Sequence, residues 1–328
     1  MTSAEMRKRP LGPTGLEVSE VGLGGVFVGE QHATRDEGIR VVHRALELGV
    51  NYIDTAPFYG NSQEVLGEAL DGRDEEVILG TKCGRWDWRT GPFHELDAFK
   101  KQFEQTFRDL RRDRVELLYI HEADWCVWWQ DDAAEQGRQF ISTDGVYDYA
   151  NAPVIQFLLW AKEQGLAEHL GISGNNAHLL AKVLKEASFP IDVVLVAFQY
   201  SLIWRNAKEH LLPLARDLGV GVVLGSPLQR KLAVPHKEWI EDPPDWMDDD
   251  LRDRFIALYE IHHDSGLSLA ELGLRFLLAD EDITTVIPGA ATVVQLEENV
   301  ASSAADPLSS DVHARLDALG RVVDGLIN

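Results

Sequence analysis

The sequence predicts an α/β fold in which eight parallel strands close into a (β/α)8 TIM barrel. Apolar runs of strand length alternate with segments of helical period along the chain, as repeated βα units require. Eight such apolar runs can be counted, the number that closes a barrel. The turn Gly-x-Gly-x-x-Gly opening a helix is absent, because Gly22–Gly25 reads GLGG and continues with VFVG. An open doubly wound sheet is therefore the second choice.

The barrel elements follow one another in a regular order. Residues 10–19 surround the turn-forming segment Gly12-Pro13-Thr14-Gly15 and predict an N-terminal β-hairpin suited to plug the bottom of the barrel. The predicted strands are 21–25, 51–55, 77–82, 116–121, 170–173, 193–199, 221–226 and 284–288. Amphipathic stretches between them, long enough to be crossover helices, include 36–48, 96–110, 154–164, 179–187 and 207–218.

Three stretches exceed the minimal βα pattern. They are 125–153, 229–250 and the tail 306–328, which ends in an apparent helix over 311–326. The first two follow predicted strands, and loops in that position face the catalytic end of such barrels. We therefore expect extended loops at the carboxyl end of the barrel that shape a substrate pocket. A subunit contact or a lid is an equally good interpretation of 125–153.

The bulk numbers fit one domain covering residues 1–328. With 45% hydrophobic and 26% charged residues, the composition is that of an ordinary globular protein. A closed α/β barrel accommodates 328 residues around one core. The formal net charge of −23 argues against partners such as nucleic acid or an anionic membrane, whose phosphates attract positive surfaces.

The location expected from the sequence is the cytoplasm. No apolar run follows the basic first residues, and no segment approaches the ~20 consecutive apolar residues of a membrane-spanning helix. Cys83 and Cys126 lie far apart and do not form a disulfide framework by themselves, which fits a reducing compartment. No metal site is predicted, since His262 and His263 are adjacent and would point to different faces of a helix.

Polar side chains that can carry chemistry stand at the ends of three neighbouring strands. NYIDTAPFYG supplies Asp54 and Tyr59, ILGTK supplies Lys82, and LLYIH supplies His121. Because the carboxyl ends of parallel barrel strands converge on one face, these four side chains can meet despite long gaps in the sequence. Taken singly, each has a plainer explanation: loop packing for a tyrosine, a solvated charge for a lysine, a core position for a histidine.

In this order and at these strand ends, the three segments closely resemble the catalytic segments of the aldo-keto reductases. The resemblance extends to GLEVSEVGLGG near the N-terminus, GISG, FQYS and IPGAATVVQLEEN, and so covers nearly the whole chain. It implies an oxidoreductase that moves a hydride between NADP(H) or NAD(H) and a small carbonyl or polyol substrate. It also implies that Asp54, Tyr59, Lys82 and His121 form a catalytic tetrad.

Carbonyl reduction explains why those residue types suit the task. Hydride arriving at a carbonyl carbon leaves an alkoxide, which Tyr59 quenches by donating its proton. A free phenol titrates near ~10, so we expect the Lys82 ammonium to stabilise the phenolate and Asp54 to keep that ammonium charged and in place. His121 would orient the carbonyl oxygen.

The resemblance also implies cofactor contacts. Ser173 and Gln199 would contact the nicotinamide carboxamide, and Glu298 and Asn299 the adenine. The strand-7 segment would follow the pyrophosphate, and the strand-8 segment would hold the adenosine end; their predicted contacts are Gly225, Ser226, Pro227, Leu228, Gly289 and Gln295.

Three departures from the family pattern bear on these contacts. Gly174 stands where many members have an asparagine, and Gly225 where many have an aromatic residue stacked on the nicotinamide, so Trp204 or a loop tryptophan would have to cover that ring. The segment GAATVVQLEEN over 289–299 has no Lys or Arg for the 2′-phosphate of NADP. Backbone donors at the start of the following helix remain as phosphate ligands. NADP is the commoner family cofactor, and NAD stays open.

The tryptophans near the predicted pocket suggest a substrate class. Aromatic faces stack on sugar rings while carboxylates accept hydroxyl hydrogen bonds, so a sugar-like substrate is one expectation, with contacts from Trp86, Trp125, Trp128 and Trp129. Reaction direction and association into oligomers stay open. An alternative function is a cofactor-binding regulatory subunit of another protein. An isomerase or aldolase using Lys82 as a Schiff base would leave Tyr59 and Asp54 unexplained.

Overall fold

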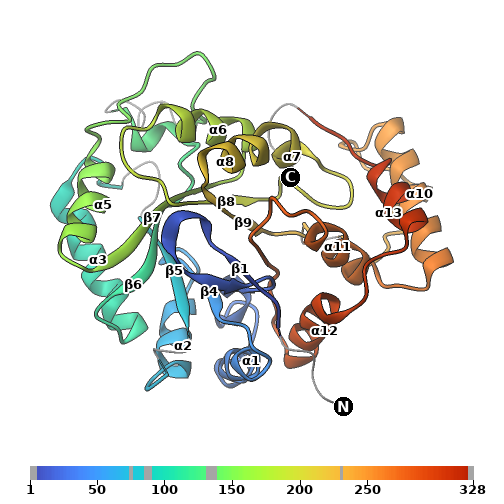
Figure 1. The fold of residues 1–328 in the computed structure, drawn as a ribbon, viewed down its shortest axis with the longest axis horizontal. Coiled ribbons are helices and arrows are strands. Elements are labelled where there is room, and N and C mark those ends of the chain that lie inside the picture. The colour runs from blue at the N-terminus through green and yellow to red at the C-terminus, as the bar shows by residue number, and fades with distance from the viewer. Residues whose placement is uncertain (1–5, 74–76, 85–90, 131–138, 230–231, 324–328) are drawn as a thin grey trace.

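The fold was described from a computed structural model, which covers residues 6–73, 77–84, 91–130, 139–229 and 232–323. Eight strands form one parallel sheet, each paired with its neighbour in chain order. They are β3 (Leu23–Gly24), β4 (Tyr52–Asp54), β5 (Ile78–Cys83), β6 (Val115–Ile120), β7 (Ala167–Gly174), β8 (Val193–Ala197), β9 (Gly221–Gly225) and β10 (Thr285–Ile287). Parallel bridges from Val21 to Val286 and from Gly24 to Gly289 join the last strand to the first (Figure 1). The predicted (β/α)8 barrel and all eight of its strands are confirmed, with shifts of a few residues at their ends.

The predicted N-terminal hairpin is present and lies across the barrel (Figure 1). Strands β1 (Lys8–Pro10) and β2 (Glu17–Ser19) pair antiparallel around the short 3-10 helix η1 (Gly12–Thr14). Gly12 has φ 54° and lies so close to Gly221 that a Cβ atom would be 2.3 Å from the Gly221 nitrogen. Glycine at this position therefore lets the hairpin plug the barrel.

Two tyrosines fill the centre of the barrel beneath the catalytic end. The hydroxyl groups of Tyr52 and Tyr119 are 2.9 Å apart, and both side chains are fully buried. Gly171 on β7 leaves the room, since a Cβ there would be 2.5 Å from the Tyr119 ring. Leu11 of the hairpin and Val18 belong to the same small core cluster. The barrel interior is thus packed and closed below the strand ends.

Helices surround the barrel. The ring comprises α1 (Arg35–Glu47), α2 (Ser62–Ala69), α3 (Leu96–Leu110), α5 (Pro153–Glu163), α6 (Ala177–Glu186), α7 (Asn206–His210), α8 (Leu212–Leu218), α11 (Leu269–Leu278) and α12 (Val293–Ala304). Side chains cap the N-termini of several of these helices, including Thr34 for α1 and Thr292 for α12. The single helix predicted over 207–218 is wrong: the chain forms two helices that meet at Leu211, because Pro213 follows and lacks an N–H for a continuous helix.

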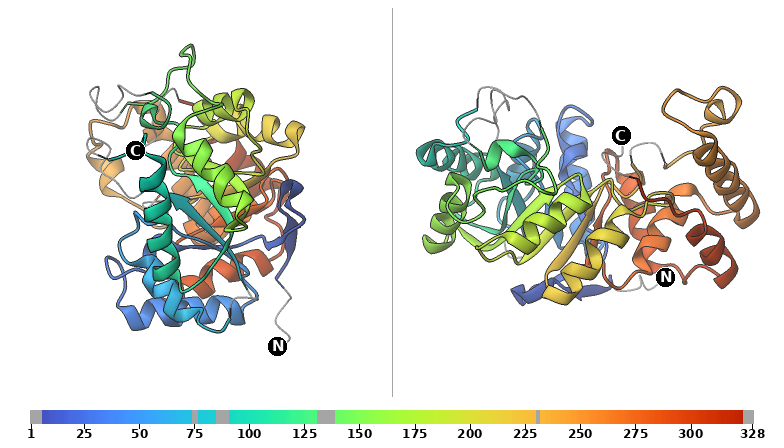
Figure 2. Two further views of the ribbon diagram at one scale, coloured as in Figure 1. Left: turned by 90° about the vertical axis from the view of Figure 1, so that its left-hand side faces the viewer. Right: turned by 90° about the horizontal axis from the view of Figure 1, so that it is seen from above.

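The long segments form structure of their own. Within 125–153 the described part contains a 3-10 helix, η4 (Cys126–Trp128). The segment after β9 contains α9 (Glu238–Glu241) and leads into the long helix α10 (Asp249–Ser265), which projects from the side of the barrel (Figure 2).

The predicted tail helix over 311–326 is only partly correct. Helix α13 (Ser310–Asp317) ends early, because the following chain binds to the segment after β8. There Arg321 donates its backbone N–H to the Ile203 carbonyl at 2.8 Å, and the Val323 N–H reaches Asn206 Oδ1 at 3.2 Å. Residues 324–326 of the predicted helix lie outside the described residues.

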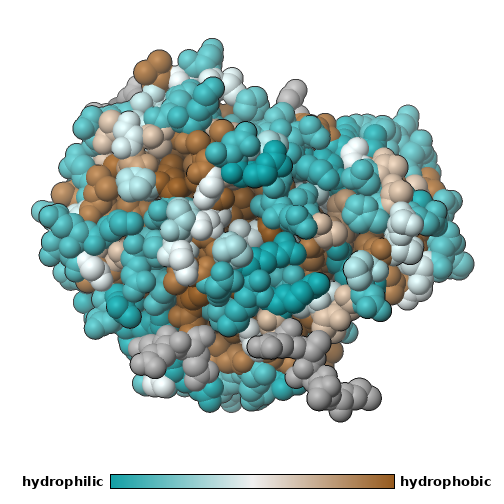
Figure 3. Space-filling view, in the orientation of Figure 1, coloured by the Kyte–Doolittle hydropathy of each residue, from teal (hydrophilic) through white to brown (hydrophobic). Residues whose placement is uncertain are grey.

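The surface is mostly polar on the face seen in Figure 3, where hydrophilic side chains cover the outer helices. Of the helices in the described part of the chain, none has the length and apolar character needed to cross a membrane.

Candidate active site

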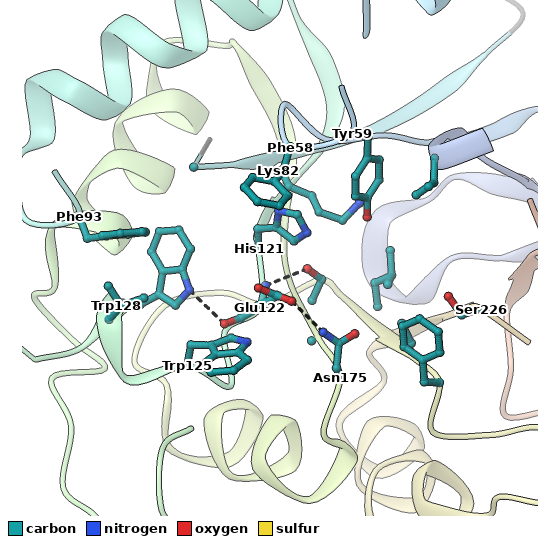
Figure 4. Close-up of a pocket in the computed structure, with 18 of the residues that line it drawn as sticks. Phe58, Tyr59, Lys82, Phe93, His121, Glu122, Trp125, Trp128, Asn175 and Ser226 are labelled. Atoms are coloured by element: carbon teal, nitrogen blue, oxygen red, sulfur yellow. Dashed lines mark hydrogen bonds between the residues drawn. The ribbon is translucent and has the colours of Figure 1, made fainter. Parts of the chain in front are cut away.

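A cavity of about 500 Å³ opens at the carboxyl ends of the barrel strands. Residues from five consecutive strand ends line it, among them Lys82 on β5, His121 after β6, Ser173 on β7, Ala197 on β8 and Ser226 after β9. Figure 4 shows the labelled side chains pointing into this space. The predicted convergence of the strand ends on one face is therefore present in the fold.

The β4–β5 register explains how Asp54 and Lys82 meet. Asp54, the last residue of β4, pairs with Gly80 of β5, and Lys82 lies two residues further along the same strand face. Lys82 Nζ donates to Asp54 Oδ2 at 2.6 Å and to the Thr55 carbonyl at 2.9 Å. The Lys82 side chain is only 1% exposed. The ammonium is thus buried and held in one position by the carboxylate.

Tyr59 and His121 complete the group. Lys82 Nζ lies 4.7 Å from the centre of the Tyr59 ring. The rings of Tyr59 and His121 meet edge to face, with centroids 5.7 Å apart. The structure therefore brings all four sequence-predicted tetrad residues together: Tyr59, Lys82 and His121 line the cavity (Figure 4), and Asp54 contacts Lys82.

The surroundings set the charge of these groups. Burial lowers the pKa of Lys82, but the Asp54 carboxylate and Tyr59 together outweigh it, so that its pKa is raised and the side chain stays an ammonium. Burial raises the pKa of Tyr59, while the Lys82 ammonium acts to lower it. Lys82 thus lowers the pKa of Tyr59 as expected, but in the protein without cofactor the effect of burial is larger. Tyr59 is therefore a protonated phenol at neutral pH, as a proton donor must be.

Ser173 and Gln199, the predicted carboxamide contacts, differ in whether they reach the cavity. Ser173 lines the cavity and donates from Oγ to the Ile120 carbonyl at 3.1 Å. Gln199 is fully buried, and its Oε1 accepts the Ala177 N–H at 3.2 Å. Its Nε2 has no hydrogen-bond partner among the described residues. A buried unpaired donor is costly, but Gln199 is not among the described residues that line the cavity, so its contact with a carboxamide stays a prediction.

The predicted pyrophosphate segment lies beside the same cavity. Ser226 lines it and has φ 50°, which places its backbone in the left-handed region. Gly225 and Pro227 are buried. Leu228 packs toward helix α11, where a Cβ on Gly273 would be 3.0 Å from its Cδ2. Of these four residues, Ser226 is the one that the described cavity exposes.

Asp124 explains the departure at Gly174. A Cβ on Gly174 would lie 2.8 Å from Asp124 Cγ, so the carboxyl group occupies the space that an asparagine side chain would need. Asp124 Oδ2 accepts the N–H groups of Asn175 and Asn176, each at 2.8 Å. Asn175 lines the cavity and donates from Nδ2 to Glu122 Oε1 at 2.9 Å (Figure 4). The sequence analysis did not identify Asp124, Glu122 or Asn175, although HEAD and GISGNN contain them.

Phe198 is an aromatic residue close to the departure at Gly225. It lines the cavity with φ 65°, and its N–H reaches the Gly225 carbonyl at 3.3 Å. Trp204, which the sequence suggested for this role, is not among the described residues that line the cavity; its ring lies 5.9 Å from the Arg321 guanidinium instead. Trp204 therefore does not reach the described cavity, because the chain after β8 turns toward the C-terminal tail. Phe198 stands directly before Gln199 in FQYS, the position that would have indicated it.

The tryptophans of 125–153 have different surroundings. Trp125 and Trp128 line the cavity; Trp125 stacks on Phe140 with centroids 4.1 Å apart, and Trp128 donates its indole N–H to the Glu122 carbonyl at 3.0 Å. Trp129 is buried, donates to the Ala123 carbonyl at 2.8 Å and is not one of the cavity residues in the described chain. The expected substrate contact of Trp129 is thus replaced by packing. Trp86 lies outside the described residues.

The predicted adenosine segment runs from the end of β10 into α12. Asn299 is buried and donates from Nδ2 to the Gly289 carbonyl at 3.3 Å. Gln295 and Glu298 are exposed on α12. A Cβ on Gly289 would be 2.1 Å from Cδ2 of Phe27, so this glycine allows the close approach of the loop after β3. Contacts with other parts of the chain therefore hold this segment in position.

This fold and site define an oxidoreductase barrel, and comparison with known proteins agrees. The profile of the aldo/keto reductase family matches residues 20–321, and the chain belongs to this family. It is similar to L-galactose dehydrogenase of Arabidopsis thaliana, with 28% identity over 92% of this chain and 89% of that protein. It is also similar to D-threo-aldose 1-dehydrogenase of a Pseudomonas species, with 24% identity over 87% of this chain and 89% of that protein.

The solved structures agree with the sequence comparisons. The holo form of the aldo-keto reductase AKR11C1 from Bacillus halodurans matches with a TM-score of 0.74 and 26% identity, covering 98% of this chain and 99% of that one. As a member of this family, the chain is an oxidoreductase that acts on carbonyl compounds.

Proposed function

We propose that the protein is an NAD(P)-dependent oxidoreductase that interconverts a carbonyl and an alcohol on a small, sugar-like substrate. The observation that carries the proposal is the buried Lys82–Asp54 ion pair beside Tyr59 and His121, at a cavity that Lys82, Tyr59 and His121 line. A structural ion pair alone would not need a phenol and an imidazole facing open space. Perturbed groups in a cavity are typical of catalytic sites.

The nicotinamide, when bound, supplies or accepts the hydride. The chain's own residues manage the proton. Tyr59 donates its hydroxyl proton to the oxygen that becomes the alcohol, and in the oxidative direction it takes that proton back. Lys82, held by Asp54 at 2.6 Å, offsets the negative charge that Tyr59 gains. His121 faces the same space and orients the substrate oxygen through its imidazole N–H.

The cavity walls support a sugar-like substrate. Phe93, Trp125 and Trp128 offer aromatic faces, and the Glu122 carboxylate lies among them (Figure 4). Apolar faces that stack on C–H-rich sugar rings, next to an acceptor for hydroxyl groups, are the features that carbohydrate binding uses. The similarity to two sugar dehydrogenases points to the same class.

The first experiment titrates the protein with NADH and NADPH by fluorescence and then screens aldehydes and sugars with the cofactor that binds. Binding with turnover is the expected result. Tight binding without turnover across a broad panel would replace this proposal with a regulatory subunit.

Tyr59→Phe tests the mechanism. It removes the proton donor while keeping the ring, so we expect kcat to fall at least about 10²-fold with cofactor affinity nearly unchanged. Tyr259→Phe, on α10 and hydrogen-bonded to the His236 N–H, is the matched control and should leave kcat unaltered. Full activity of Tyr59→Phe would exclude Tyr59 as the proton donor.

A further inference from the structure

A carboxylate from the first barrel helix lies at the start of the last one. Glu37 belongs to the first turn of α1, and its Oε1 accepts the backbone N–H of Val293, the first residue of α12, at 3.1 Å. Helices α1 and α12 lie side by side in the ring (Figure 1). This contact joins residues 256 positions apart and brings Glu37 to the segment assigned above to the adenosine end of the cofactor.

Two further backbone donors at this helix start have acceptors as well. The Ala291 N–H donates to Gln295 Oε1 at 2.9 Å, and the Gln295 N–H donates to Thr292 Oγ1 at 3.3 Å. A phosphate of NADP would therefore have to displace these acceptors before it could bind these N–H groups. The strongest anion site of a helix, its N-terminus, already holds an anion supplied by the chain.

The nearby cations are also engaged. Arg40 Nε donates to Glu37 Oε2 at 3.0 Å, and its Nη2 contacts the same oxygen. Arg44, one turn further along α1, contacts Glu297 of α12 at 2.8 Å and Glu47 at 2.9 Å. A 2′-phosphate would have to displace these carboxylates before either guanidinium could bind it. Arg40 and the Val293 N–H hold the pKa of Glu37 below its usual range, so this carboxylate is ionised at neutral pH.

We propose that Glu37 makes the protein select NAD over NADP. A carboxylate at the adenosine end accepts a hydrogen bond from a ribose hydroxyl and repels a phosphate on that same oxygen. The inference rests on the proposed function, because it requires that a nicotinamide dinucleotide binds in the barrel. Glu37 is not among the described residues that line the cavity of the tetrad, so it sets specificity without taking part in the chemistry.

The test measures dissociation constants for NADH and NADPH by fluorescence titration, with no turnover required. We expect the unmodified protein to bind NADH at least about tenfold more tightly than NADPH, as adjacent like charges predict. Glu37→Gln removes the charge and leaves an amide that can still contact Val293, and it should close most of that gap by strengthening NADPH binding. Asp36→Asn, one residue earlier in the same turn and exposed, is the matched control and should leave the ratio unchanged.

A double variant identifies what the phosphate would bind. In Glu37→Gln, Arg40 is released, so Glu37→Gln with Arg40→Gln should lose the gain in NADPH affinity. Glu37→Asp keeps the charge and should keep the NADH preference, which separates the charge from a purely structural link between α1 and α12. A structural link would change both affinities together and leave their ratio constant.

Each outcome bears on one proposal. Equal binding of both cofactors by the unmodified protein, or a preference for NADPH, would overturn the role of Glu37 while the proposed oxidoreductase stands. An unchanged ratio in Glu37→Gln would overturn it as well. Binding of neither cofactor would instead refute the proposed function.

Discussion

Two buried carboxylates at opposite ends of the barrel differ in whether both of their oxygens have hydrogen-bond partners. Glu20, before β3 at the hairpin end, is 1% exposed and contacts Arg7 at 2.7 Å and Arg9 at 3.3 Å. Asp54, at the carboxyl end of β4, contacts Lys82 through Oδ2, but its Oδ1 has no hydrogen-bond partner in the described part of the chain. Asp124 Oδ1, at the same end, is likewise buried and unpartnered among those residues.

Charged groups at the two ends of the barrel have different roles, stability at one end and chemistry at the other. At the hairpin end, Arg9 also donates to the carbonyls of Leu278, Asp280 and Ile283, so charges there hold the hairpin to the segment between α11 and β10. At the catalytic end, charges are desolvated without full hydrogen bonding, which costs stability and leaves groups that respond to a ligand. Variants at the two ends should therefore change different properties.

Lys82→Met should have the largest effect. It leaves Asp54 buried without its cation, so we expect kcat to fall about 10³-fold and the free energy of unfolding to drop by about 3 kcal/mol. Steady-state kinetics and urea unfolding measure the two effects. Lys208→Met, in which the lost side chain is 43% exposed and away from the cavity, is the control. Near-normal turnover would show that the pair is structural.

Arg9→Met should reduce stability at the hairpin end of the barrel. It removes one partner of buried Glu20 and the donor to three carbonyls, which predicts a loss of about 2 to 3 kcal/mol in the free energy of unfolding. Turnover per folded molecule should not change, because the hairpin lies at the far end of the barrel. A fall in kcat without a loss of stability would contradict the division between the two ends.

Asp124→Asn should change the pH dependence of stability. Burial raises the pKa of Asp124 from 3.8 to about 7, so the folded state binds this proton more tightly than the unfolded state. Stability from this group is present below about pH 4 and is lost as the pH rises toward 7, at up to about 1.4 kcal/mol per pH unit. Urea unfolding at pH 5 and pH 7 should show a smaller decline in the variant than in the unmodified protein. Parallel declines would mean that Asp124 does not titrate in this range.

The sequence by itself determined the barrel and the tetrad. Alternating apolar runs and helical segments specify parallel strands, and parallel strands place their last residues at one end of the barrel. The sequence therefore predicts that Asp54, Lys82 and His121 lie close together. Whether a segment is a helix or a strand depends on the spacing of its apolar residues, which can be read from neighbouring positions in the sequence.

Only the tertiary structure decided the details around them. Whether Trp129 or Trp128 reaches the cavity depends on which side of a loop faces the barrel, and the end of α13 depends on the pairing of Arg321 with Ile203. Asp124 fills the space above Gly174, and Glu37 meets Val293 from the opposite end of the chain. These contacts form only when the barrel closes and brings distant segments side by side. No local sequence pattern relates the residues that meet, so only the folded structure could show them.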